Sequence, residues 1–184
     1  AYHMFEELIK CSDLLTKFGG HPMAAGLSLP EENVEAFRKQ MNENCPFRAE
    51  EMVQTIHIDV PMPVDYVTNA LVEEFSILAP FGKDNPKPVF ADRNLKISRM
   101  WIVGKNQNVL RMTLISKQGR PLSAIYFGDI EAMQTYLMEQ YGTQEVDKAF
   151  HGRENSMQIS IVYSPKLNTY KDSETLQFEI QYYR

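Results

Sequence analysis

The sequence predicts an α+β fold in which a short segment of helices and a glycine-rich turn precedes a five-stranded β region. Apolar residues recur at helical spacing in residues 2–17 and 34–41, whereas from residue 89 onward the apolar period becomes two. The β region then contains three strand-like segments, one helical segment and two more strand-like segments. With 184 residues, 43% of them apolar, the chain can bury one sizeable core or two small ones.

The first fifty residues predict a helix, a turn, a strand and a second helix. We expect the first helix, over residues 2–17, to end at Gly19-Gly20, because helices often end at glycine. Residues 24–29 predict a short buried strand, and Pro30 suits the first turn of the next helix. These elements bury little on their own, so we expect the rest of their sheet to lie upstream, in a longer protein. The inner face of the second helix is expected to carry Val34, Phe37 and Met41.

The remaining residues predict the β region and its helices. The predicted elements are a strand over 53–60, a helix over 66–79 capped by Asp65, strands around 95–98, 110–115 and 121–127, a helix over 130–141 capped by Asp129, a polar loop over 142–155, and strands over 157–163 and 176–183. Three strands, a helix and two strands is the order of an oligonucleotide-binding (OB) barrel, although the pattern alone fits a small sandwich equally well. We place two domains at 1–50 and 51–184, with a boundary between Cys45 and Pro63.

The cysteines and the apolar runs limit the class of protein. Cys11 and Cys45 are far apart in the sequence and each lies on an apolar helical stripe. We therefore expect two buried, reduced thiols and a cytosolic (cytoplasmic) protein. No apolar run approaches the ~20 residues that a membrane span needs, so we expect no membrane partner.

The charge distribution bears on nucleic-acid binding. A net charge of −5 argues against a polyanionic partner, but residues 93–120 contain seven basic residues and no acidic one. Such a run is often only a solvated face. Because this one lies on predicted strands within an acidic protein, we expect it to mark one cationic face. Its members are Arg93, Lys96, Arg99, Lys105, Arg111, Lys117 and Arg120.

Residues 18–29 carry the most specific local pattern in the chain. Two adjacent glycines precede His21, and two alanines and Gly26 follow, so the backbone is nearly without side chains. Exposed N–H groups without a Cβ in the way, beside one side-chain donor, suit an anion that lies against the main chain. The alternative is a tight turn whose small residues serve close packing, with His21 a satisfied polar residue.

Three segments resemble known proteins. Gly19 to Gly26 resembles the GGH-x-x-AAG signature of the accessory domain of DHH-type phosphoesterases. Together with residues 11–15 and the segment Pro80-Phe81-Gly82-Lys83-Asp84-Asn85-Pro86-Lys87-Pro88-Val89-Phe90, it resembles the RecJ family of single-strand-specific DNA exonucleases. Asp84 departs from the glycine usual in that family. The resemblance favours an OB barrel over a sandwich, preceded by part of an α/β DHH-associated domain.

The resemblance implies 5′→3′ exonuclease activity on single-stranded DNA for the whole protein, with Mn²⁺ or Mg²⁺ held in an upstream DHH domain. The four histidines, His3, His21, His57 and His151, belong to no metal-binding motif, so we expect no catalytic residue and no metal ligand in this chain. Its task would be to orient the strand end. The residues implied to contact a phosphate are Gly19, Gly20 and His21 with the main chain of Ala24, Ala25 and Gly26.

A barrel that holds single-stranded DNA needs cations along a groove and aromatic faces on which bases stack. Trp101 fits a stacking role and a core position equally well, whereas Arg111 and Lys117, on the polar side of a strand, favour phosphate contact. Tyr163, Tyr170 and Tyr183 are further aromatic residues that no spacing selects. The predicted DNA-binding residues are Arg99, Trp101, Lys105, Arg111, Lys117 and Tyr126.

Two other functions fit the pattern. The chain could be an interaction module that docks a helicase or a single-strand-binding protein, or part of a small-nucleotide phosphodiesterase that shares the GGH loop. The long β region after residue 63 argues against the phosphodiesterase. We expect the chain alone to lack nuclease activity and to bind oligonucleotides in a salt-dependent way. Burial of His21, or basic side chains on opposite sides of the barrel, would argue against nucleic-acid binding.

Overall fold

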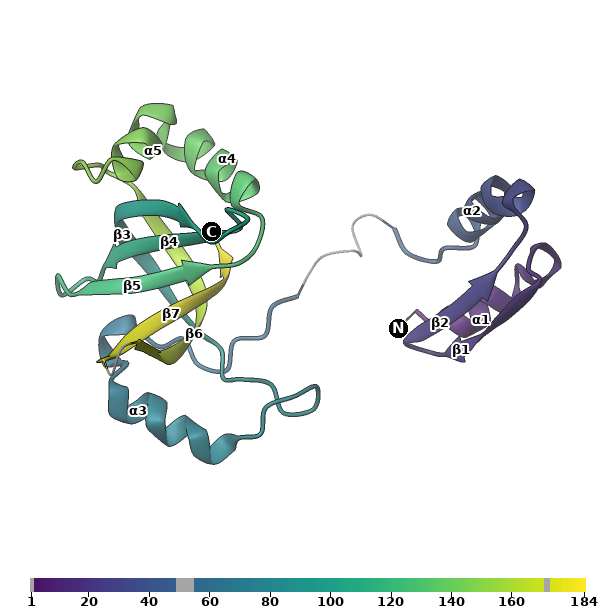
Figure 1. Cartoon of the computed structure of the whole chain (residues 1–184), viewed down its shortest axis with the longest axis horizontal. Helices are drawn as coiled ribbons and strands as arrows, with labels where there is room; N and C mark the ends of the chain where they lie inside the picture. The colour runs from purple at the N-terminus through teal and green to yellow at the C-terminus, as the bar shows by residue number, and fades with distance from the viewer. Residues whose placement is uncertain (1, 49–54, 171–172) are drawn as a thin grey trace. The chain divides into compact units, whose positions relative to one another are not determined.

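The computed structural model describes residues 2–48, 55–170 and 173–184. The chain divides into two compact units, residues 1–55 and 56–184 (Figure 1).

The N-terminal unit contains two short helices and a hairpin. Its elements are α1 (Met4–Ile9), η1 (Ser12–Leu14), β1 (Lys17–His21), β2 (Ala24–Ser28), η2 (Glu31–Asn33) and α2 (Val34–Glu43). The predicted single helix over 2–17 was wrong, because α1 ends after Ile9 and a 3₁₀ turn follows. Ser12 and Asp13 occupy this turn, and such short polar side chains compete with helical hydrogen bonding. Gly19 and Gly20 lie in β1 and do not cap a helix.

The C-terminal unit is a closed five-stranded barrel with the strand order β3-β4-β5-β7-β6. Its strands are β3 (Phe90–Val103), β4 (Val109–Ile115), β5 (Pro121–Tyr126), β6 (Gln158–Tyr170) and β7 (Ser173–Tyr183). All neighbouring pairs are antiparallel except β5 and β7, which are parallel. Alternate residues of β4 and β5 point into the core, as their period of two predicts. The OB-type barrel, which the family resemblance favoured over a sandwich, is confirmed.

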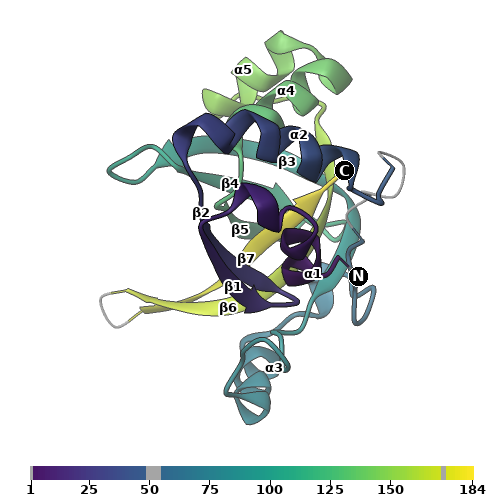
Figure 2. The same ribbon diagram turned by 90° about the vertical axis from the view of Figure 1, so that its right-hand side faces the viewer.

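Helices cover the two ends of the barrel. α4 (Ile130–Tyr141) and α5 (Thr143–Phe150) lie at one end, and α3 (Asn69–Glu74) lies at the other, as both views show (Figures 1 and 2). Asp129 caps α4 as predicted, through its carboxylate and the amide of Ala132. The loop predicted over 142–155 was wrong, since α5 occupies most of it. Its apolar stripe consists of only two buried residues, Val146 and Ala149, which is too short to stand out in the sequence.

The segment before the barrel follows a mostly irregular path. The strand predicted over 53–60 was wrong in its described part, where only Val60 makes a bridge, to Phe90; residues 53 and 54 lie outside the described residues. Thr68, not Asp65, caps α3, and a 3₁₀ helix, η5 (Phe75–Leu78), follows. Phe90 is buried, and the centroid of its ring lies 5.9 Å from that of Tyr163.

The thiols differ in environment. Cys11 is buried, and burial raises the pKa of its thiol. Cys45 is exposed, contrary to the prediction, because α2 ends at Glu43 and Cys45 lies beyond its apolar stripe. Among the described helices, none is long and apolar enough to cross a membrane.

Candidate nucleic-acid interface

The glycine-rich stretch forms a β-hairpin with a two-residue turn. Gly19 pairs with Gly26, Gly20 with Ala25, and His21 with Ala24. A Cβ on Gly20 would lie 2.5 Å from the carbonyl oxygen of Ala24, so this position requires glycine. A Cβ on Gly19 or Gly26 would meet nothing within 4 Å. The paired Gly19 and Gly26 therefore leave a stretch of bare backbone, which borders a shallow hollow between the strands.

His21 lies at the end of this hairpin and is exposed to solvent. Its Nδ1 accepts a hydrogen bond of 3.2 Å from the amide of Met23, which fixes the ring at the turn. Because Nδ1 accepts this bond, the neutral ring carries its hydrogen on Nε2, which can act as a donor. The observation that would have argued against an anion site, a buried His21, is not found.

The described residues do not provide a metal centre. No group of three or more His, Cys, Asp or Glu among them is arranged to hold an ion.

Two arginines flank Trp101 on the outer surface of the barrel. Trp101 on β3 lies directly opposite Arg111 on β4, and Arg99 precedes it by two residues. The guanidinium Cζ atoms of Arg99 and Arg111 lie 5.6 and 5.8 Å from the centroid of the indole ring. Cation–π attraction at these distances stabilises the cluster and holds both charges beside one aromatic plane. Trp101 thus belongs to the surface of the sheet and not to the core.

The basic residues at Trp101 lack acidic partners in the part of the chain that the structure describes. Among the carboxylates that the structure describes, none forms an ion pair with Arg99, Lys105 or Arg111. The Nε of Arg111 is buried and has no hydrogen-bond partner in the described structure. Lys105 lies in the loop between β3 and β4, one hairpin turn from Trp101. These three cations and Trp101 form what we call the Trp101 cluster.

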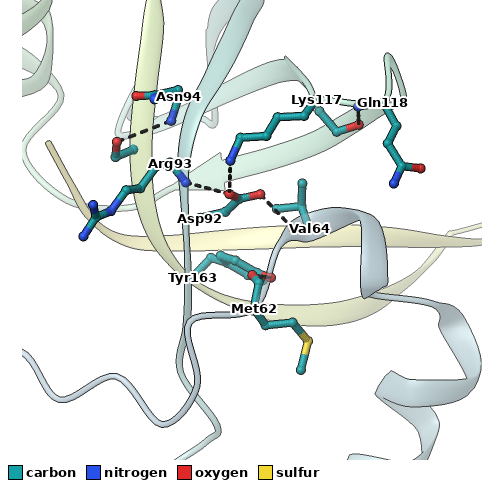
Figure 3. Close-up of polar contacts among 10 residues, drawn as sticks. Met62, Val64, Asp92, Arg93, Asn94, Lys117, Gln118 and Tyr163 are labelled. Carbon is teal, nitrogen blue, oxygen red and sulfur yellow. Dashed lines mark hydrogen bonds and ion pairs between the residues drawn. The ribbon is translucent and has the colours of Figure 1, made fainter.

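Lys117 is placed differently (Figure 3). Its Nζ lies 3.5 Å from Oδ1 of Asp92, whose side chain is only 5% exposed. The same carboxylate accepts hydrogen bonds from the backbone amides of Val64 and Arg93, at 3.0 and 2.7 Å. Lys117 therefore neutralises a buried carboxylate that binds the segment before the barrel to β3.

Two further basic residues of the 93–120 block, Lys96 and Arg120, also have structural partners. Lys96 pairs with Glu154 at 3.9 Å, and Arg120 donates to the carbonyl of Val67 at 3.1 Å. Six residues separate Arg111 from Lys117, which corresponds to about 20 Å along extended chain. The predicted single cationic face is thus divided between the two ends of the β3–β4–β5 region, and the Trp101 cluster gathers three cations without acidic partners among the described residues.

Tyr126 does not present a ring face to solvent. Its residue is 8% exposed, and its ring makes an edge contact with Tyr183, with centroids 5.6 Å apart. Burial raises the pKa of its hydroxyl above the ordinary 10.0. This position contradicts the predicted stacking role. Tyr163 is also fully buried, and its hydroxyl donates to the carbonyl of Met62 at 2.8 Å.

The next residue, Phe127, is exposed instead, and sequence reasoning missed it. The alternation of inward- and outward-facing residues along β5 could have identified Phe127. Leu122 and Ala124 point inward, so Tyr126 must do the same and Phe127 must point outward. This alternation therefore selects Phe127, and not Tyr126, as the aromatic residue that faces solvent.

The fold and the surface together describe a protein of the OB class with a partly exposed aromatic and cationic cluster on its barrel. Residues 58–182 match the family model of the RecJ OB domain, and residues 2–45 match the DHHA1 domain. The chain belongs to the RecJ OB domain family. The resemblance found in the sequence is therefore confirmed.

Curated relatives are longer than this chain. The single-stranded-DNA-specific exonuclease RecJ of Bacillus subtilis is 34% identical over 115 residues, which cover 61% of this chain and 15% of that protein. The RecJ of Haemophilus influenzae is 28% identical over 173 residues, covering 92% of this chain and 27% of that protein. The chain thus spans between about a seventh and about a quarter of the length of these relatives.

Solved structures agree on the fold. The crystal structure of Thermus thermophilus RecJ in complex with Mg²⁺ matches with a TM-score of 0.67 and 18% identity, covering 100% of this chain and 25% of that chain. The complex of the same protein with Mn²⁺ gives a TM-score of 0.66 at 18% identity, over 97% of this chain and 23% of that chain.

Proposed function

We propose that this chain binds single-stranded DNA as part of a 5′→3′ single-strand-specific exonuclease, and that the Trp101 cluster is its main contact. The observation that supports this most directly is the placement of Arg99 and Arg111 within about 6 Å of the indole ring of Trp101, with no acidic partner among the described residues. A base can stack on an aromatic and guanidinium surface while the cations contact adjacent phosphates. Neither interaction depends on base identity, so the binding is expected to be independent of sequence.

The hairpin has a separate role in this proposal. The main chain at Gly19, Gly20 and Ala24 to Gly26, together with Nε2 of His21, contacts a terminal phosphate of the strand. Its contribution is orientation of the scissile bond. Mn²⁺ or Mg²⁺ would supply the hydrolytic chemistry from residues outside the described ones. We place this function in cytosolic DNA repair and recombination; the two cysteines, both free thiols, support a reducing compartment.

A titration of the 184-residue chain with oligo(dT) tests the proposal, with the fluorescence of its single tryptophan, Trp101, as the readout. We expect quenching and an affinity that falls with salt. Neutralisation of about three phosphates by Arg99, Lys105 and Arg111 predicts a slope of about −2 for log affinity against log salt concentration.

An acidic peptide of equal charge serves as the second titrant, because the competing function is docking of a helicase or a single-strand-binding protein. Tighter binding of the peptide than of the oligonucleotide would favour that function. Binding of DNA that does not respond to salt would contradict the proposed phosphate contacts. We also expect no cleavage by this chain when Mn²⁺ or Mg²⁺ is added.

A further inference from the structure

An aromatic residue more exposed than Trp101 lies on the same side of the barrel sheet as the Trp101 cluster. Phe127 follows β5 directly and is 53% exposed. The Nζ of Lys166, on β6, lies 5.3 Å from the centroid of its ring. Lys166 in turn forms an ion pair of 2.7 Å with Glu179 on β7. Residues from three strands therefore converge on one solvent-facing ring.

The strand register connects this ring with the Trp101 cluster. Trp101 pairs with Arg111, Arg111 with Ile125, and Ile125 with Glu179, so these four residues form one row across β3, β4, β5 and β7. Phe127 lies two residues beyond Ile125, and so on the same outer face of the barrel. Two strand spacings, or about 10 Å, separate β3 from β5.

The charge at Phe127 distinguishes it from the Trp101 cluster. The carboxylate of Glu179 neutralises Lys166 and holds its ammonium group beside the ring, so this position offers little net charge to a phosphate. What it offers is an aromatic surface fixed in orientation by a cation. The ligand chemistry that fits such a surface is the face of a base.

We propose that Phe127 is a second base-stacking platform, which receives a base of the same single strand whose neighbouring nucleotides lie on the Trp101 cluster. This inference rests on the proposed function, because a strand must first lie along the row from Trp101 to Phe127. A single OB barrel contacts about 4–16 nucleotides, so one strand can reach both platforms. The strand therefore crosses from β3 towards β7, over the outer surface of β4 and β5.

The test compares Phe127→Ala, Phe127→Leu and Phe127→Tyr in the 184-residue chain, by anisotropy of labelled oligo(dT). We expect the alanine and leucine variants to bind about 5- to 100-fold more weakly, which is the loss of one stacked base. The tyrosine variant should retain wild-type affinity. The slope against salt should stay unchanged in all three, because no phosphate contact is removed.

Tyr66 provides a matched control. It is 72% exposed and lies in η4 (Val64–Tyr66), among the elements before the barrel strands. Tyr66→Ala should bind DNA as the wild type does. An oligomer of abasic deoxyribose phosphates is the second control, and we expect it to bind the wild type and Phe127→Leu with equal affinity.

The outcomes separate the two proposals. If Phe127→Leu binds oligo(dT) as tightly as the wild type while Arg111 variants lose affinity, the stacking platform is excluded and the proposed function stands. A leucine variant that loses equal affinity for the abasic oligomer would also exclude stacking. If the wild-type chain binds no oligonucleotide, both proposals fail together.

Discussion

The Nζ of Lys117 lies 3.5 Å from the carboxylate of Asp92, whereas the guanidinium of Arg111 lies against the ring of Trp101. Both are basic residues of the same stretch of sequence, β4 and the turn that follows it. Lys117 compensates a negative charge inside the protein, and Arg111 has no such charge to compensate among the described residues. The two cations should therefore respond differently when DNA is added.

Arg111→Gln and Lys117→Gln test this difference. We expect Arg111→Gln to weaken oligonucleotide binding and to reduce the salt slope by about 0.7, the value for one lost phosphate contact on a single strand. Lys117→Gln should leave the slope within error of the wild type. Anisotropy titrations at several salt concentrations measure both. An equal loss for the two variants would mean that Lys117 leaves Asp92 to contact DNA.

The carboxylate of Asp92 should contribute to the free energy of unfolding of the barrel unit. Its buried carboxylate accepts the amide hydrogens of Val64 and Arg93, so Asp92→Ala leaves two backbone donors without their partner. We expect a loss of about 1–3 kcal/mol in the free energy of unfolding of the barrel unit. Lys117→Gln should cost at most about 1 kcal/mol, because the lysine is 58% exposed and water replaces its contact. Urea unfolding followed by Trp101 fluorescence compares the two, and a larger loss for Lys117→Gln would contradict this assignment.

The barrel was the most predictable part of the fold, for a physical reason. The alternation of β4 and β5 is a local property, and the core-facing residues of α4, Ile130, Met133 and Leu137, follow helical spacing within twelve residues. The N-terminal hairpin was less predictable. Two glycines after an apolar stripe are typical of a helix end, but here Gly20 is needed because the opposite strand passes close to it.

The candidate site was predictable only in part. The basic block on predicted strands selected Arg99, Trp101, Lys105 and Arg111, and the register of β3 and β4 places Trp101 opposite Arg111. The sequence pattern could not show that Asp92, 25 residues away in sequence, would engage Lys117, because that contact depends on the register between β3 and β4 and on the turn that follows β4. Strand parity could have selected Phe127 over Tyr126, but the exposure of Phe127 also depends on Lys166 and Glu179, which come from distant strands.

Glu145 should make the stability of the barrel unit depend on pH. Hydrogen bonds from Lys148 and from the amide and hydroxyl of Ser156 lower the pKa of its carboxyl from 4.5 to about 2. A carboxylate with a lowered pKa stabilises the fold above its ordinary pKa, and this contribution is lost as the pH falls from about 4.5 towards 2. The bonds to Ser156 fix α5 to the segment that enters β6.

The comparison is thermal unfolding of the wild type and Glu145→Gln between pH 7 and pH 2. We expect the variant to have the lower melting temperature at pH 7, and the two curves to converge at about pH 2. Glu139→Gln, at an exposed position of α4, is the control and should follow the wild type throughout. A constant difference between wild type and Glu145→Gln over the whole range would show that ionisation of Glu145 does not contribute.

Gly19 and Gly20 are adjacent, yet alanine should destabilise the hairpin at Gly20 and have little effect on its stability at Gly19. A Cβ on Gly20 would lie 2.5 Å from both the carbonyl oxygen of Ala24 and the Cα of Ala25, which are backbone atoms that cannot move aside without opening the hairpin. We expect Gly20→Ala to destabilise the hairpin by about 1–3 kcal/mol. Gly19→Ala adds a methyl group in open space, so its effect should stay within about 0.5 kcal/mol.

Amide hydrogen exchange in β1 and β2 reports on this hairpin without averaging over the barrel. Gly20→Ala should lower protection of the strand amides, and Gly19→Ala should leave it unchanged. The same two variants then distinguish a change in the structure of the hairpin from the loss of a phosphate contact. If Gly19→Ala keeps its protection but weakens binding of a 5′-phosphorylated oligonucleotide, the methyl group has blocked the bare backbone at which the phosphate is proposed to lie. If binding is also unchanged, the phosphate does not approach the hairpin at Gly19.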